Sequence, residues 1–271
     1  MHALLKRSVK AVFNAAGLEI KRKRVIKIHP LTYLNESGEY SNKTIDDLLK
    51  ECKRYHLGCG LLIVDNYVNI DGDFGWLSAN AALSFVTPSG AVIDTPRVGV
   101  PHAVDGKPST FVLAYDLRNG IPARRDTLET IYHCHFLEHL TSEEGRALLE
   151  DCYRCLARGG TLRVAVPDFE LWCKNYLSDN TEFFNWYRSE YLGNDFERFR
   201  TKGSIFMGMV FGFEHKMHYD FHTIEFVLAE TGFRDIKRAA WGVSEAVKNI
   251  GLLEGDSPRR FESLIVECTK P

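Results

Sequence analysis

A short stretch of the chain places two histidines and a glutamate three and four residues apart. His135, Glu138 and His139 have the spacing i, i+3, i+4, which on one helical turn brings all three side chains to the same face. Imidazole and carboxylate groups are ligands for divalent metals, and a histidine that titrates near neutral pH can accept a proton. The later segment GFEHKMHYD adds His215 and His218, which could complete such a site.

The residues leave several uses of this group open. His135 or His139 can act as a general base, with His218 as a helper from the opposite wall. Glu138, His139, His135 and His215 can instead bind a divalent metal such as Mg²⁺ or Mn²⁺. A plainer interpretation is that Glu138 and His139 brace the start of a helix while one histidine works alone. The HxxEH pattern also matches a class of zinc hydrolases, but those enzymes need the motif inside a helix.

A strand, a helix and a second strand are predicted around this motif. The apolar run Thr130–Cys134 precedes the histidines, and Thr141 with Glu144 forms a capping box for a helix. Two glycines at 159–160 are expected to end that helix. The run Leu162–Val166 is typical of a strand buried on both faces. Such a βαβ unit implies a parallel sheet, in which ligands bind at the carboxyl ends of the strands.

Three earlier strands are also predicted to end in residues suited to a ligand. The stretch Arg54–Gly60 runs into a turn with Gly58 and Gly60, where glycine permits positive φ and a close backbone approach. The stretches Tyr67–Asp71 and Phe111–Asp116 each end in an aspartate. Few residues separate the glycine turn from the second strand, so the helix that usually connects such strands is expected to be missing or reduced to a turn.

The remaining chain supplies insertions and the closing elements. Residues 72–110 form a long insertion with a predicted hairpin around SFVTPSGAVI. Residues 169–213 are rich in aromatic side chains and predict helices that cover the strand ends, either shaping an acceptor pocket or packing as a small core of their own. A helix at Phe221–Thr231 and strands at Ile236–Trp241 and Phe261–Cys268 are expected to follow.

The order of these features resembles a known family. The segments LEHL, YRCLARGGTLRVAVPD and HYDF with the later AETGF are similar to those of class I S-adenosylmethionine-dependent methyltransferases, in particular the type 11 branch. The resemblance implies an α/β fold: a doubly wound, Rossmann-like, mainly parallel sheet with an antiparallel last strand, a long insertion after the second strand and a helical, aromatic-rich cap. It covers the methyltransferase domain expected at residues 54–271, after an N-terminal lead-in of residues 1–53.

The resemblance also assigns roles to single residues. Gly58 and Gly60 would pass under the methionine part of S-adenosylmethionine. Asp71 would hold the ribose hydroxyls, and Asp116 with Leu117 would meet the adenine.

Two other positions in the expected cofactor site depart from the family pattern. The motif around His135 is, in addition, similar to a metal site of other methyltransferases. His56 stands where the family usually has the acid that opens the glycine motif, and the third glycine is absent. His135 would line the sulfonium side. The motif around His135 also looks like the ExxEH…H metal site of small-RNA 2′-O-methyltransferases and ubiquinone-pathway O-methyltransferases, with His135 in place of the first glutamate.

Composition and charge indicate which partners and which cell compartment to expect for this protein. The chain has 271 residues and a net charge of −2, which argues against a general nucleic-acid binder. Seven cysteines are expected to be reduced thiols in the cytoplasm. The basic, amphipathic residues 1–24 either contact the inner face of a membrane peripherally or pack on the domain or a partner subunit.

The sequence therefore predicts a cytoplasmic methyltransferase that acts on oxygen. A sugar or glycoconjugate acceptor is expected because similar short-loop relatives are encoded among sugar-transferring enzymes of surface-polysaccharide assembly. The alternative from another class is a methyltransferase-like protein that binds a nucleotide or a partner without turnover.

Overall fold

The computed structural model describes residues 52–60, 62, 64, 67–72, 111–178, 180–192 and 199–271, together with the backbone of four short strands. Two of these strands, β1 (Tyr33–Leu34) and β2 (Tyr40–Ser41), pair with each other. The amphipathic segment 1–24 lies outside the described residues. In the part of the chain that is described, no helix has the length and apolarity to cross a membrane.

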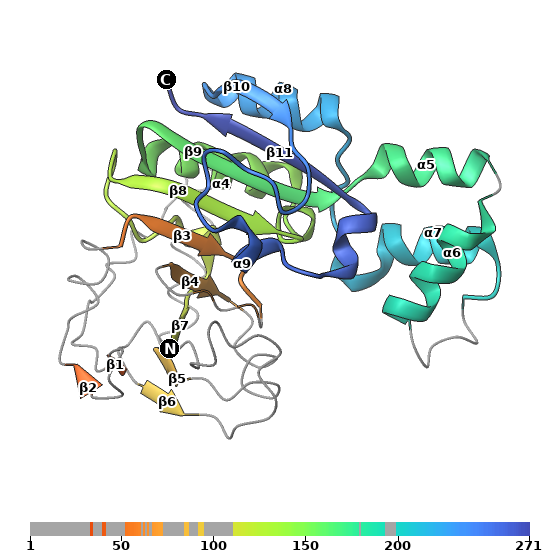
Figure 1. The fold of residues 1–271 in the computed structure, drawn as a ribbon, viewed down its shortest axis with the longest axis horizontal. Coiled ribbons are helices and arrows are strands. Elements are labelled where there is room, and N and C mark those ends of the chain that lie inside the picture. Colours follow the sequence, from red (N-terminus) through yellow and green to blue (C-terminus); the bar gives the residue numbers. More distant parts are fainter. Residues whose placement is uncertain are drawn as a thin grey trace, which may run out of the picture.

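A large mixed sheet forms the centre of the fold (Figure 1). Its described strands lie in the order β10-β11-β9-β8-β3-β4-β7-β5-β6. All neighbouring pairs from β9 to β5 are parallel, whereas β11 is antiparallel to both of its neighbours and β6 is antiparallel to β5. The predicted doubly wound, mainly parallel sheet with an antiparallel last strand is therefore confirmed. The strands are β3 (Arg54–Leu57), β4 (Val68–Asp71), β5 (Ser84–Val86), β6 (Val92–Asp94), β7 (Phe111–Ala114), β8 (Leu128–Cys134), β9 (Leu156–Pro167), β10 (Arg234–Arg238) and β11 (Ser263–Thr269).

Alternate residues of the central strands pack against opposite layers. On one face, residues such as Ile131 and Val164 pack with the helices α4 (Ser142–Cys155) and α8 (Phe221–Thr231). On the other face, Tyr132, Ala165 and Ile265 pack with the short helix α9 (Ile250–Glu254). This period of two is what a strand buried on both sides requires.

The helix after the histidine motif begins as predicted and ends earlier. Thr141 and Glu144 form the expected capping box of α4. The helix ends at Cys155, not at the glycine pair, because Leu156 already pairs with Leu128 in the sheet. The Lys270 ammonium donates to the Tyr153 and Leu156 carbonyl oxygens at 2.8 Å. A distant side chain therefore satisfies carbonyl groups at the helix end, where a glycine cap usually does so.

Both insertions have the predicted kind of structure. Strands β5 and β6 form the expected hairpin, and β5 extends the sheet by pairing with β7. The aromatic-rich segment forms α5 (Phe169–Leu177), α6 (Thr181–Tyr187), a π turn (Arg188–Leu192) and α7 (Lys202–Phe211). These helices have an aromatic core centred on the fully buried Trp172. Figure 1 shows them beside the carboxyl ends of β8 and β9.

A buried ion network fixes the segment between β10 and β11 to the sheet. The Arg163 guanidinium on β9 donates to the Glu254 carboxylate at 2.5 and 2.6 Å and to Glu267 at 2.7 Å, and all three side chains are almost fully buried. The same guanidinium donates to the carbonyl oxygens of Ala240 and Val243. One side chain on β9 thus holds both ends of the loop that carries α9.

We predict a large loss of stability when this guanidinium is removed. Arg163→Ala would leave the buried carboxylates of Glu254 and Glu267 unpaired, which costs about 3–5 kcal/mol. Urea unfolding measures the change. The matched control is Arg146→Ala, which removes an exposed ion pair with Glu150 and should cost less than about 1 kcal/mol. Equal losses in the two variants would contradict the role given to Arg163.

Candidate active site

A cleft of about 1150 Å³ lies at the carboxyl edge of the parallel strands. Its floor is the glycine turn after β3 and the end of β4. One wall comes from the residues after β8, and another from the loop around α9. Tyr187 and Tyr191 reach it from the helical cap. The cleft is thus in the place that ligands occupy in open α/β sheets.

The glycine turn fits the expected cofactor site. Gly58 and Gly60 have φ angles of +59° and +53°, a conformation that glycine adopts without strain. A Cβ at position 58 would lie 2.4 Å from the Phe136 ring, so only glycine lets the turn pack there. The Gly60 N–H donates to the Asp71 carboxylate at 2.9 Å. The two strand ends predicted to hold the cofactor are therefore joined by a hydrogen bond.

The third strand end is also at the cleft, but its acid already has a partner. Asp116 caps the short 3₁₀ helix η1 (Leu117–Asn119) and accepts two hydrogen bonds from the Arg118 guanidinium at 2.9 and 3.0 Å. Leu117 is buried and lines the cleft. At this end of the cleft, Leu117 offers apolar surface and Arg118 holds the Asp116 carboxylate in place.

His56 lies at the floor of the cleft in an almost fully buried position. Its ring packs 5.2 Å from that of Tyr132, and burial lowers the pKa of the imidazole to about 3. A neutral imidazole cannot supply the negative charge of the acid that usually opens this motif.

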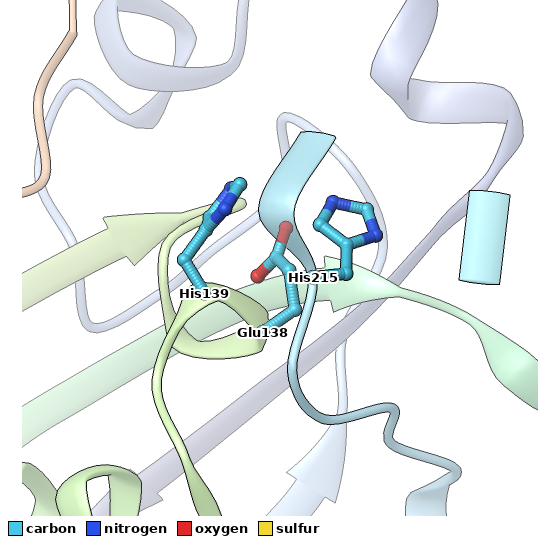
Figure 2. A group of neighbouring side chains, drawn as sticks. All are labelled: Glu138, His139 and His215. Atoms are coloured by element: carbon cyan, nitrogen blue, oxygen red, sulfur yellow. The ribbon is translucent and has the colours of Figure 1, made fainter. Parts of the chain in front are cut away.

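Three of the predicted metal ligands come together at the other end of the cleft. Donor atoms of Glu138, His139 and His215 all lie within 4.8 Å of one another. Figure 2 shows the Glu138 carboxylate between the two imidazoles. The 3₁₀ turn η2 (Leu137–His139) carries the first two residues, and the backbone N–H groups of Lys216 and Met217 bind the Glu138 carbonyl oxygen. Backbone hydrogen bonds therefore place the His215 segment beside η2.

Glu138 is the most unusual member of this cluster. Its side chain is fully buried, and neither carboxyl oxygen has a hydrogen-bond partner among the described residues. Burial raises the pKa of this carboxyl to about 8. A buried carboxyl without partners is costly, so this group is suited to meet a ligand, a proton or a cation.

Backbone contacts orient the two histidines of the cluster. The His215 Nδ1 lies 2.7 Å from the Met209 carbonyl oxygen. A carbonyl can only accept, so Nδ1 carries the hydrogen and Nε2 keeps a free lone pair. Burial lowers the pKa of His215 to about 4. Burial also lowers the pKa of His139, although a hydrogen bond to the backbone of Phe213 acts in the opposite direction. Both rings are thus held as neutral bases or ligands.

The structure corrects the places of two other histidines. His135 does not share one helical face with Glu138 and His139, because its φ of +51° breaks the chain between β8 and η2. Its Nε2 lies 2.7 Å from the Ser263 hydroxyl and its Nδ1 lies 3.5 Å from the Glu138 carboxyl. His135 therefore lies against Glu138 and is not in the three-ligand group.

His218 is farther from the proposed chemistry than predicted. It is not among the cleft-lining residues. Its Nε2 lies 2.8 Å from the Val210 carbonyl oxygen, and its ring packs against Phe169 and His215. Its place is behind His215, not on the opposite wall. The HxxEH motif likewise spans a strand end and a 3₁₀ turn, so the helix that zinc hydrolases need is absent at this motif.

Two charged residues of the cleft were missed from the sequence, whereas the aromatic cap was predicted. Arg259 and Glu262 come from η6 (Pro258–Phe261) and the residue after it. Tyr187 and Tyr191 come from the helical cap. The signal that could have found the first two is position: an antiparallel last strand must begin at the carboxyl edge of the others, so charged residues just before it face the ligand site.

Among the comparisons with known proteins, only the search of solved structures found similar chains. No protein-family model and no curated protein matches the sequence. Among solved structures, the chain is similar to an S-adenosylmethionine-dependent methyltransferase from Archaeoglobus fulgidus, with 16% identity, 83% of this chain and 89% of that chain covered, and a TM-score of 0.41. The magnesium protoporphyrin IX methyltransferase of Synechocystis with bound S-adenosylhomocysteine has 15% identity, coverage of 83% and 77%, and a TM-score of 0.40.

A third similar structure is an S-adenosylmethionine-dependent methyltransferase of Thermotoga maritima, described as a possible histamine N-methyltransferase. It has 14% identity, coverage of 84% and 86%, and a TM-score of 0.41. Likenesses this distant carry no argument about substrate or mechanism. The strand order of this chain defines the fold.

We predict a pH-dependent stability difference from a buried carboxyl of this cleft. Burial raises the pKa of Glu262 from 4.5 to about 7. Between these values the folded protein keeps a proton that the unfolded chain loses, so this contribution to stability falls as the pH rises. Glu262→Gln, which has no such proton, should gain about 1 kcal/mol per pH unit relative to the parent between pH 5 and 7.

Urea unfolding at several pH values measures this difference. Glu143→Gln, at an exposed position on α4, controls for the loss of one acidic side chain. A difference between Glu262→Gln and the parent that stays constant with pH would show that Glu262 is ionised in the folded protein.

Proposed function

We propose that this protein is an S-adenosylmethionine-dependent methyltransferase. The observation that carries the proposal is the joined pair of strand ends, in which the Gly60 N–H donates to the Asp71 carboxylate beside an open cleft. Glycines without side chains let a ligand approach the sheet edge, and an acid at the next strand end suits two ribose hydroxyls. Leu117 adds an apolar surface suited to the adenine at the following strand end.

The residues of the chain would bind and orient the reactants. S-adenosylmethionine, when bound, supplies a methyl group on a sulfonium, and its transfer forms a carbon–oxygen bond, breaks a carbon–sulfur bond and leaves a neutral thioether. Asp71 and the glycine turn would hold the cofactor. The neutral imidazole of His139 lies in the cleft and can accept the proton of an acceptor hydroxyl. His135 would support the adjacent Glu138 carboxyl.

Oxygen as the accepting atom is part of this proposal. A hydroxyl must lose its proton during transfer, and the cluster of neutral imidazoles and a carboxyl provides groups that can take it. The sugar or glycoconjugate acceptor remains a prediction that rests on the family resemblance.

We also propose that Glu138, His139 and His215 bind a divalent cation. The residues fit such an ion in three respects: a buried carboxylate without hydrogen-bond partners, two imidazoles within 4.8 Å, and a His215 ring whose Nδ1 is fixed by a carbonyl oxygen. A bound ion would supply Lewis acidity toward an acceptor oxygen. Of the four predicted ligands, His135 would then lie behind Glu138.

We predict that removal of the Asp71 carboxylate, the expected ribose contact, weakens cofactor binding. Asp71→Ala should weaken S-adenosylhomocysteine binding about 10- to 100-fold, because hydrogen bonds to a charged group contribute about 1.5–3 kcal/mol. Calorimetric titration measures the affinity. Glu150→Ala, at an exposed position on α4, should bind like the parent. If the parent binds neither S-adenosylmethionine nor S-adenosylhomocysteine, the methyltransferase proposal fails.

Binding and turnover separate the two function classes. Transfer of a labelled methyl group to an added hydroxyl acceptor would support the enzyme. Tight cofactor binding with no transfer to any acceptor tested would favour the non-catalytic alternative, a methyltransferase-like binding protein.

We predict saturable Mn²⁺ binding that depends on the cluster. Glu138→Gln and His215→Ala should each weaken Mn²⁺ binding at least about 10-fold, as the loss of one of three ligands requires. Electron paramagnetic resonance of free Mn²⁺ measures this without any need for activity. His218→Ala is the control, since His218 lies outside the three-ligand group. Parent-like Mn²⁺ binding in Glu138→Gln would remove the ion from this site.

A further inference from the structure

Arg259 is an arginine of the cleft wall that forms no ion pair within the described chain. Arg259 sits on η6, directly before β11, and lines the cleft. Its Nη1 lies 3.4 Å from the Cys134 carbonyl oxygen and 3.7 Å from the Cys134 sulfur. No ion pair with a carboxylate is formed by Arg259 within the described chain, whereas its neighbour Arg260 pairs with Asp256.

This lack of an ion pair distinguishes Arg259 from Arg163. Arg163, whose side chain is fully buried, has two carboxylate partners, whereas the partly exposed Arg259 forms no ion pair within the described chain. A cation held away from bulk water is costly unless an anion accompanies it. The carboxyls of Glu138 and Glu262 interact electrostatically with Arg259 but form no ion pair with it, so the guanidinium keeps N–H groups for an anion that enters the cleft.

The groups around Arg259 are suited to bind oxygen atoms that carry negative charge. The buried Tyr191 hydroxyl interacts with the Glu262 carboxyl and, electrostatically, with Arg259. Burial raises the pKa of the nearby Glu262 carboxyl to about 7, and in its protonated form this carboxyl can donate a hydrogen bond. A guanidinium fork beside O–H donors complements a carboxylate or a phosphate.

The position of Arg259 connects the anion to the proposed chemistry. Arg259 acts electrostatically on Glu138, His139 and His215, so its charge lies near the cluster. It also acts on His56 below the glycine turn. The anion would therefore bind between the cofactor end and the cluster end of the cleft.

We propose that Arg259, with Tyr191 and Glu262, forms an oxyanion subsite that anchors a carboxylate or phosphate of a ligand in this cleft. The identity of that ligand rests on the proposed function, whereas the subsite itself does not. Two sources share this chemistry: an acidic acceptor, held with its methylated atom near His139, and the carboxylate of the cofactor's methionine part. An acidic acceptor would narrow the substrate class to molecules with a negative group close to the accepting atom.

Calorimetric titrations of the full chain test the subsite with three probes. Inorganic phosphate reports on the anion alone, S-adenosylhomocysteine carries the amino-acid carboxylate, and 5′-methylthioadenosine has the same nucleoside and thioether without it. Arg259→Gln removes the guanidinium, and Arg259→Lys keeps the charge without the fork. Arg260→Gln is the matched control, because it removes the adjacent, exposed arginine. Circular dichroism melting confirms that each variant is folded.

The expected result is a loss of anion binding confined to position 259. Arg259→Gln should weaken the binding of phosphate or S-adenosylhomocysteine at least about 10-fold, Arg259→Lys should have an intermediate effect, and Arg260→Gln should match the parent. An acidic acceptor is the source if phosphate binding is lost while S-adenosylhomocysteine binds as in the parent. The cofactor is the source if S-adenosylhomocysteine weakens while 5′-methylthioadenosine does not.

Two results would overturn the subsite. One is unchanged binding of both phosphate and S-adenosylhomocysteine in Arg259→Gln, and the other is an equal loss in Arg260→Gln. Failure of the methyltransferase proposal looks different: the parent would bind neither nucleoside, while phosphate binding would still depend on Arg259.

Discussion

The cleft depends on the buried ion network of Arg163. The α9 segment covers one face of the sheet with only a few apolar residues, chiefly Val247, Ile250 and Leu253. The guanidinium of Arg163 adds fixed contacts to this thin layer by holding Glu254, Glu267 and two backbone carbonyls at once. Without it, the wall that carries Arg259 would lack a rigid connection to β9.

Buried polar groups without a hydrogen-bond partner occur both at the cleft, as in Glu138, and away from it, as in His133. Arg163 and Asn69 have complete sets of partners. At the cleft, Glu138 has no hydrogen bond from a described residue and Arg259 forms no ion pair within the described chain. Groups that are costly in the empty protein are the ones that gain most when a ligand supplies the missing contact.

Local patterns made much of the fold predictable from the sequence. The capping box of Thr141 and Glu144, the helix Phe221–Thr231 and the hairpin between β5 and β6 depend on neighbouring residues, and all three are confirmed. The end of α4 was predicted four residues too late, because its carbonyls are satisfied by Lys270, more than a hundred positions away. A distant partner of that kind leaves no local signal.

The candidate site was predictable only in part, for the same reason. Spacing alone suggested Glu138 and His139, and a later histidine was expected to join them. Spacing also placed His135 in the group, which required a continuous helical turn. The left-handed backbone of His135 and the short 3₁₀ turn replace that helix. Arg259 was missed because nothing near it in the chain marks it as enclosed.

The position of β11 in the sheet has a consequence for how the protein is made. This strand lies between β9 and β10 although it follows both in the chain, so β10 reaches the sheet only through it. A ribosome that has not yet translated β11 carries a chain without Glu267 and with an incomplete cleft wall. Ligands stabilise only the state that binds them. A ligand that needs the complete cleft wall can therefore stabilise the fold only after β11 has been translated.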